Sequence, residues 1–299
     1  MRHRLEAVAA VLTEGLLIGV LWVATFSAAC AQTQSSPHGG HYGLDADLEG
    51  AYRPIAVDLS SEAWYRYIYR NDASRLWDGL YIKGGGALDI NPAYGRVGAY
   101  VEWMPVAILI LRAEFDRYAF FGTNGSLLIY TDSSAPFGVA DYKARRGQEV
   151  AAGADRIMLQ PTLQVEIGSW MLVNQASFAR YDFQHSGPYF WEQEYDTLLA
   201  RHDRLFADDL SLLYDFAREA KAEHLLVGPS LEVVHASGAN LTRTRAGLSL
   251  YFEPHARVHA ADYQIRPRFY FQLGVNTQDR NQDGRLYVLG GIGMGVDFD

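Results

Sequence analysis

Arginine recurs at alternate positions in two late segments of the chain. The first segment contains Arg243 and Arg245, and the second contains Arg266 and Arg268. Residues two apart in a strand project from the same face, so each pair lies on one face. If the two segments are neighbouring strands, the four guanidiniums form one basic wall. Such a wall can orient a charged solute, or it can be closed by ion pairs with carboxylates across an interior.

Acidic residues show the same alternation in earlier segments, with apolar residues between them. The acidic positions predicted for the interior face are Glu102, Glu114, Asp116 and Glu166. The alternation also predicts Arg180 and Asp182 on that face, and Leu159, Leu163, Phe269 and Phe271 on the opposite, apolar face. Long segments with one polar and one apolar face are typical of strands that cross a bilayer at a tilt.

A third group of polar residues has the spacing of metal ligands. Asp279, Asn281 and Asp283 stand at alternate positions, and Gly284 follows at the sixth position. This is the first half of a calcium loop, but the twelfth position is Gly290 instead of the bidentate glutamate. Calcium is therefore one hypothesis, and a hairpin turn formed by Asp-Gly is the other. The sequence indicates no other cofactor.

Two histidines stand beside residues that could form a hydrolytic site. His185 precedes Ser186, and His202 precedes Asp203. A nucleophile and its base must meet in space, and adjacency in sequence does not establish that. No catalytic residue is assigned, and a membrane-embedded lipid hydrolase is kept as the third hypothesis.

The last segment, Arg285–Phe298, shows which elements position these groups. Its even-numbered residues are apolar apart from Gly290, and its odd-numbered residues are mainly small or polar. An aromatic residue next to the C-terminus, here Phe298, resembles the closing strand of Gram-negative outer-membrane β-barrel proteins as a general class; Asp299 departs slightly from their pattern. The resemblance implies recognition by the barrel-assembly machinery and contact with outer-membrane lipid and lipopolysaccharide.

The remaining segments predict an all-β fold, a transmembrane antiparallel up-and-down β-barrel. Ten strands fit between Leu80 and Phe298, and there are twelve if an N-terminal hairpin from Leu44 to Arg70 joins. The alternative for residues 60–72 is a short helix. Short turns, including Met104-Pro105 and Gly168-Ser169, alternate with long segments, which places the short turns in the periplasm. The long outer segments are predicted at Phe121–Ala154 and Gln184–Ala207.

The N-terminus carries a targeting pattern. Arg2 and Arg4 precede an uncharged run that ends in Ala29-Cys30-Ala31, which predicts a secretory signal peptide over residues 1–31. Cys30 is either removed with this peptide or kept as a lipidated first residue. Residues 32–78 then form a periplasmic lead or the first hairpin, and residues 79–299 form the barrel.

Composition limits the function. The single cysteine excludes a disulfide within the chain, and the net charge of −9 argues against nucleic-acid binding. The leading hypothesis is a narrow channel or porin-like protein of the cell outer membrane with a charged lumen. The alternative is a non-conducting structural or adhesion barrel that acts through its extracellular loops. Neither the solute nor the oligomeric state is encoded in a recognisable motif.

Overall fold

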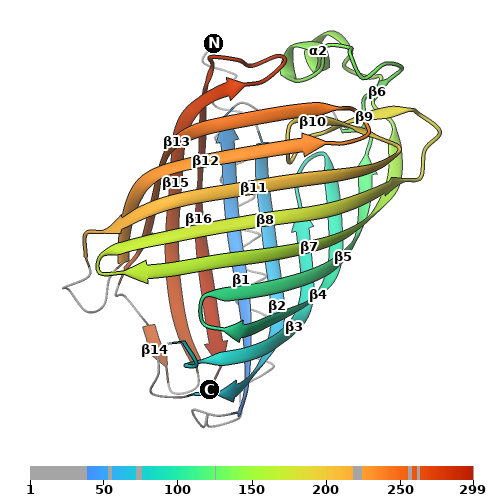
Figure 1. Ribbon diagram of the computed structural model, residues 1–299. Coiled ribbons are helices and arrows are strands. Elements are labelled where there is room, and N and C mark those ends of the chain that lie inside the picture. The colour runs from blue at the N-terminus through green and yellow to red at the C-terminus, as the bar shows by residue number, and fades with distance from the viewer. Residues whose placement is uncertain are drawn as a thin grey trace.

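The computed structural model describes residues 39–52, 56–71, 76–124, 126–217, 224–254, 258–260 and 263–298. Residues 1–31, the predicted signal peptide with Cys30, lie outside these ranges. Figure 1 shows long strands that follow one another around a closed wall. The wall strands are β1 (Gly39–Tyr52), β2 (Ala56–Arg70), β3 (Leu80–Ile90), β4 (Tyr94–Val106), β5 (Leu109–Phe121), β7 (Ala151–Ile167), β8 (Trp170–Phe183), β11 (His202–Asp215), β12 (His224–Ala236), β13 (Leu241–Glu253), β15 (Tyr263–Gln278) and β16 (Leu286–Phe298).

The wall closes because the first strand pairs with the last. Along this seam Tyr42 opposes Phe298 and Tyr52 opposes Val288, and β13 pairs directly with β15. Each wall strand is antiparallel to both neighbours, so its backbone groups find partners on either side. The twelve-stranded form of the prediction is confirmed. The helix considered for residues 60–72 is wrong, because residues 56–70 pair with β1 and β3.

The two long connections, residues 122–150 and 184–201, both lie at the outer end of the wall, as predicted, and short connections such as residues 91–93 lie there too. Gly168-Ser169 joins β7 to β8, and the positive φ of Gly168 suits a glycine. The turn expected at Met104-Pro105 lies slightly later, at Ala107-Ile108, because β4 continues to Val106 through an irregular register. We call the end that carries these two turns periplasmic, and we call the opposite end, with the two long connections, outer. This follows the general pattern of such barrels. The strand β14 (Val258–Ala260) forms an extra hairpin with the start of β15 at the periplasmic end.

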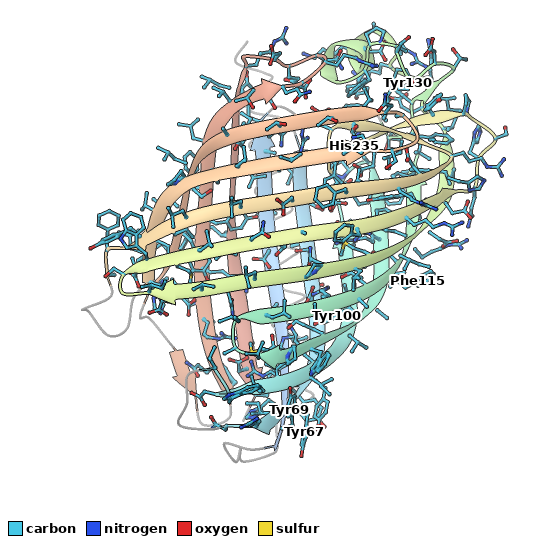
Figure 2. All side chains as sticks on the ribbon, in the orientation of Figure 1. Tyr67, Tyr69, Tyr100, Phe115, Tyr130 and His235 are labelled. Atoms are coloured by element: carbon cyan, nitrogen blue, oxygen red, sulfur yellow. The ribbon has the colours of Figure 1, made fainter. Side chains whose placement is uncertain are left out.

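The outward face of the wall is an apolar belt between two aromatic bands. The four residues predicted to face lipid, Leu159, Leu163, Phe269 and Phe271, are all exposed. The periplasmic band includes Tyr65, Tyr67, Tyr69, Trp103 and Trp170, and the outer band includes Phe115, Phe121 and Phe178; Figure 2 shows Tyr67 and Tyr69 near one end of the wall and Phe115 farther along it. A closed wall with this belt is the architecture of a transmembrane barrel. The chain is an outer-membrane β-barrel. Within the described ranges, no helix is long and apolar enough to span a membrane.

Polar residues on the outward face correct one expectation. Arg180 and Asp182 were predicted inside, but they are exposed and share the outward face with Phe178, while Tyr181 and Phe183 are buried inside. These two residues lie at the outer border of the apolar belt, two and four residues past Phe178 along β8. Within the belt itself, Asn174 donates a hydrogen bond of 2.7 Å to Asp208 on the neighbouring strand, so this polar pair satisfies itself.

The inward glycines of β16 make room for an ion pair across the closing seam. Gly293 opposes Arg268 on one side and Asp47 on the other. The Arg268 side chain crosses over β16, where its Nε donates to an Asp47 carboxylate oxygen at 2.9 Å and its Nη1 lies 3.4 Å from Asp45. A Cβ atom at Gly293 would overlap both the Asp47 carboxylate and the Arg268 guanidinium. The small inward face of the last strand is therefore a steric requirement of this seam.

The belt generates a first prediction. Leu248 is 59% exposed in the middle of β13, so Leu248→Arg should lower the free energy of unfolding in lipid vesicles by about 2–4 kcal/mol. Ile167→Arg is the matched control, because Ile167 lies beside the periplasmic turn, where the same change should cost only about 0–1 kcal/mol. Equal destabilisation in urea titrations of the two variants would contradict the assigned depths.

The seam generates a second prediction. Gly293→Ala should displace the Arg268–Asp47 ion pair and destabilise the barrel by about 1–3 kcal/mol. Gly50→Ala on the neighbouring strand is the control, because its Cβ would meet only Gly290 O, at 3.9 Å. The two urea midpoints check this, and a Gly293→Ala midpoint equal to that of the control would argue against a stabilising seam ion pair.

Candidate functional site

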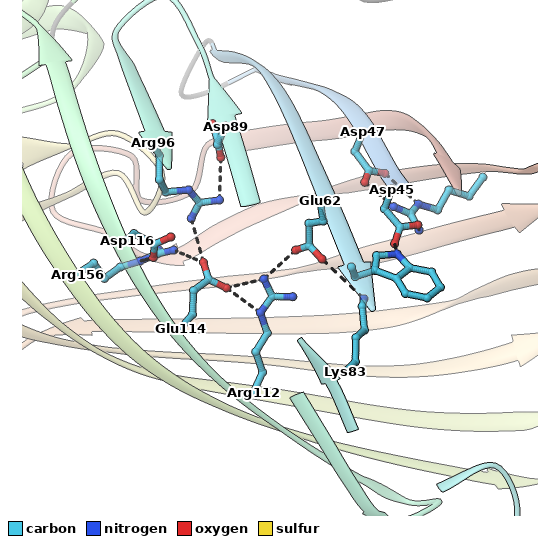
Figure 3. A network of polar contacts seen from close by, with 12 residues as sticks. Asp45, Asp47, Glu62, Lys83, Asp89, Arg96, Arg112, Glu114, Asp116 and Arg156 are labelled. Atoms are coloured by element: carbon cyan, nitrogen blue, oxygen red, sulfur yellow. Dashed lines mark hydrogen bonds and ion pairs between the residues drawn. The ribbon is translucent and has the colours of Figure 1, made fainter. Parts of the chain in front are cut away.

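A connected network of charges lines the inward face of β2 to β7. Arg156 is 1% exposed and donates to Asp116 at 2.7 Å and to Glu114 at 3.2 Å. Arg112 joins Glu114 to Glu62, with distances of 2.7 Å to each carboxylate. Figure 3 shows these groups converging from separate strands. Every guanidinium in this chain of contacts has at least one carboxylate, as burial of charge requires.

The register of the strands explains why these residues meet. Arg156 stands directly opposite Asp116, and Arg96 stands directly opposite Asp89. Opposite charges on directly opposed residues attract across a strand pair, and Arg96 lies 2.9 Å from Asp89. The Arg112 guanidinium also lies 3.7 Å from the centre of the Tyr100 ring, a cation–π contact.

The two long outer connections fold back over the interior of the barrel. They contribute α2 (Val139–Ala144) and a small separate sheet of β6 (Ile129–Tyr130), β9 (Tyr189–Glu192) and β10 (Thr197–Ala200). Their apolar side chains form one core with inward residues of β4 to β13. The members contributed by the connections include Leu127, Leu128, Phe190, Trp191, Leu198 and Leu199. The outer part of the interior is therefore packed on this side of the wall.

The turn between β9 and β10 carries carboxylates into the interior; we call residues 189–200 the constriction hairpin. Glu194 lies 3.5 Å from Arg156 of the wall and accepts a hydrogen bond of 3.4 Å from Tyr118. Glu192 holds the turn by accepting the backbone N–H groups of Glu194 (3.1 Å) and Tyr195 (2.7 Å). The hairpin thus presents Glu194 to the wall at a fixed position.

The first strands of the wall add further carboxylates near this turn. Glu49 of β1 directly opposes Asp58 of β2, and Asp58 is a close neighbour of Asp89 on β3. Electrostatic repulsion from Glu194 reaches both Glu49 and Asp58. Within the described residues neither Glu49 nor Asp58 has an ion pair, whereas Asp89 has Arg96. Glu49, Asp58 and Glu194 together form the acidic constriction.

The predicted basic wall does not form. The expectation placed all four arginines on one wall of two neighbouring strands, but Arg245 opposes Asn276, and Phe252 opposes Phe269. The start of β15 pairs with β14, which shifts its register against β13. As a result, Arg243 and Arg245 lie near the outer end, and Arg266 and Arg268 lie near the periplasmic end.

Each arginine pair has its own carboxylates. Glu232 forms ion pairs with Arg243 and, at 3.7 Å, with Arg245. At the other end Arg266 lies 2.9 Å from Asp297, and Arg268 forms the seam ion pair described above. None of the four guanidiniums is available as a free anion site in this arrangement.

The four acidic residues predicted for the interior face do not form one cluster either. Glu114 and Asp116 belong to the charge network around Arg156. Glu102 accepts a hydrogen bond of 2.6 Å from Tyr81. Glu166 lies near the periplasmic turn, opposite Met171, away from the other three.

The predicted calcium loop closes on itself. The Asp279 carboxylate accepts the backbone N–H groups of Asn281 and Gln282, both at 2.7 Å, and Gly284 has a positive φ. Within the described ranges no three histidine, cysteine or acidic side chains gather as metal ligands. Calcium binding through Asp279, Asn281 and Asp283 stays a prediction that rests on their spacing.

Neither histidine pair forms a nucleophile and base. His185 Nδ1 accepts the backbone N–H of Gly187 at 3.1 Å. His202 lies outside the wall, 2.8 Å from Asp182. Asp203 points the other way and accepts backbone N–H groups of Ala200 and Arg204, both at 2.7 Å.

Comparison with known proteins gives similarity at the level of structures. No protein-family model and no curated protein sequence matches the chain. Among solved structures it is similar to the translocator domain of autotransporter NalP from Neisseria meningitidis, with 9% identity, 97% of each chain covered and a TM-score of 0.45. It is also similar to KdgM porin in complex with disordered oligogalacturonate, with 7% identity, 86% of this chain and 98% of that chain covered and a TM-score of 0.36. OmpT, an outer membrane protein of Vibrio cholerae, gives 9% identity, coverage of 89% and 98%, and a TM-score of 0.33.

The constriction hairpin generates a prediction about pH. Burial, together with the neighbouring Glu194 carboxylate, raises the pKa of Glu192 to about 8, whereas an unfolded glutamate ionises near about 4.3. Between these values the folded hairpin holds a proton that the unfolded hairpin releases. Its stability should therefore be greatest below about pH 4 and should be lost as the pH rises towards 8.

Hydrogen exchange of residues 189–200, corrected for its intrinsic pH dependence, measures this effect. Protection should fall between pH 5 and pH 9 in the wild type. Glu192→Gln should flatten the dependence, and Asp182→Asn, which changes a carboxylate outside the wall, should leave it unchanged. An unaltered pH dependence in Glu192→Gln would assign the titration to another group.

Proposed function

We propose that this protein is a narrow outer-membrane channel whose interior prefers cations. The observation that supports this best is the acidic constriction, in which Glu194 of the hairpin faces the same part of the interior as Glu49 and Asp58 of the wall. A loop folded into a barrel reduces the free cross-section at one level. Charged side chains at that level then decide which ions pass.

The sign of the preference follows from how the charges are paired. The arginines of the interior network are held by carboxylates, which neutralise them locally. Glu49 and Asp58, in contrast, have no ion pair within the described residues, so whatever negative charge they carry is not neutralised by a neighbouring cation and makes the potential near the hairpin negative. A negative constriction attracts cations and repels anions at close range.

A second candidate function has its own supporting observation. The apolar core formed by the outer connections includes Leu127, Phe190 and Leu198, each 0% exposed. If this packing continues across the whole interior, the barrel is closed. Its role would then be structural or adhesive, through the surface of the outer connections. This candidate shares the wall and the hairpin with the channel and differs only in conductance.

Single-channel recording in planar bilayers separates the two candidates. The wild type should conduct, and its reversal potential in a salt gradient should indicate cation preference. The double variant Glu49→Gln, Asp58→Asn should lower this preference several-fold without loss of folding. The control is Asp182→Asn, which removes a carboxylate of the same charge from the outside of the wall and should change nothing.

A deletion variant makes the test decisive. Replacement of residues 189–200 by a short glycine-serine linker should raise the conductance, because the hairpin reduces the cross-section. A silent wild type together with a conducting deletion variant would support the closed barrel. A conducting wild type whose ion preference is the same in the double variant would contradict a role for Glu49 and Asp58.

A further inference from the structure

Two arginines face outward side by side at the outer border of the apolar belt. Arg180 of β8 directly opposes Arg204 of β11, and both side chains are exposed. Directly opposed residues on one face of antiparallel strands have Cβ atoms roughly 4.5–5.5 Å apart, and like charges there repel. We call Arg180 and Arg204 the arginine pair.

The arginine pair has no acidic partner within the described residues. Neither guanidinium has a hydrogen bond or an ion pair to the rest of the described chain. The row just beyond it is different: Arg117 lies 2.8 Å from Asp155, and His202 lies 2.8 Å from Asp182. The two nearby carboxylates are thus already engaged. Neither of these carboxylates offsets the repulsion between Arg180 and Arg204, so an anionic ligand bound between the two guanidiniums would reduce it.

An apolar groove lies beside the arginine pair, on the membrane side. It has a volume of about 520 Å³ and is lined by residues of β5, β7, β8 and β11, including Ile157, Leu159, Phe178 and Phe206 together with both arginines. The rings of Phe178 and Phe206 lie 5.2 Å apart. A hydrocarbon chain would bury apolar surface in this groove, and an anionic group at its outer end would meet two guanidiniums.

We propose that the arginine pair and this groove bind lipopolysaccharide of the outer leaflet, with a lipid phosphate between Arg180 and Arg204 and an acyl chain in the groove. The charge is complementary, because guanidinium groups bind phosphate through paired, charge-assisted hydrogen bonds. The position is complementary as well, because the pair lies at the boundary between hydrocarbon and polar surface. A soluble anion would use the arginines but not the groove.

Binding of lipopolysaccharide to the purified, folded barrel tests the proposal. Native mass spectrometry in detergent counts bound lipid, and titration gives the affinity. The double variant Arg180→Gln, Arg204→Gln should bind at least tenfold more weakly than the wild type. Arg117→Gln is the matched control: it removes one exposed arginine from the next row, where Asp155 already engages it, and it should bind as the wild type does.

Further arms identify the two parts of the ligand. Lipopolysaccharide with its lipid phosphates removed should bind the wild type as weakly as intact lipid binds the double variant. Phe178→Ala should weaken binding of intact lipid, while inorganic phosphate alone should not compete at millimolar concentration. Heat modifiability on gels shows that each variant is folded; if the double variant fails this check, Arg180→Gln alone should still weaken binding several-fold.

Two results would overturn the proposal. One is equal affinity of the wild type and the folded arginine variants. The other is an equal loss in Arg117→Gln, which would show that general surface charge, and not the arginine pair, attracts the lipid.

Discussion

Closure of the wall is the constraint on which the rest of this structure depends. In hydrocarbon each backbone N–H and C=O group must find a partner within the protein, so the first strand has to pair with the last. That seam joins residues that are far apart in the sequence, and a long-range pairing of this kind is costly in loop entropy. The Arg268 side chain adds a bond across it, because the inward glycines of β16 let it reach Asp45 and Asp47 of β1. Small residues in the last strand therefore face the interior and leave room for the Arg268 side chain, while the apolar residues of the same strand face the lipid.

Closure also decides where charge can be placed. Inward residues of twelve strands face a limited interior, so most of their charges are neutralised locally, as Arg156 is by Asp116 and Glu114. The constriction hairpin enters the same space and contributes Glu194, which lies 3.5 Å from Arg156, a guanidinium that already contacts Asp116 and Glu114. On the outward face, polar side chains within the belt bond to one another, as Asn174 and Asp208 do, and exposed arginines lie at the outer border of the belt. Arg180 and Arg204 lie at this boundary, where a charge can be held at little cost.

Alternation in the sequence predicted the wall well and the sites less well. Leu44, Ala46 and Leu48 alternate with Asp45, Asp47 and Glu49, and the structure places these two sets on opposite faces of β1. Alternation alone does not give a register, and β14 shifted β15 against β13 by occupying its first residues, which separated Arg245 from Arg268. Alternation also fails to predict which way a side chain points where the apolar belt ends. Arg180 was therefore predicted to face the interior, although it is two residues from Phe178 and so lies on the same outward face. The hairpin had a signal that could have been used: Phe190, Trp191, Leu198 and Leu199 are too apolar for a connection that stays in water.

The division between wall and hairpin suggests where function can change without loss of the fold. Wall strands are held on both sides by backbone pairing, so a change there threatens closure. The hairpin pairs within itself and with β6, and it is joined to the wall by side-chain contacts such as the one between Glu194 and Arg156. Displacement of the hairpin would expose its apolar core and break those contacts, yet it would leave each wall pairing intact. Segments attached in this way open at lower free energy than the scaffold that carries them. The residues that fill the outer part of the interior therefore include those of a hairpin that pairs only with itself and β6, whereas the residues that face the membrane are on strands paired along both edges.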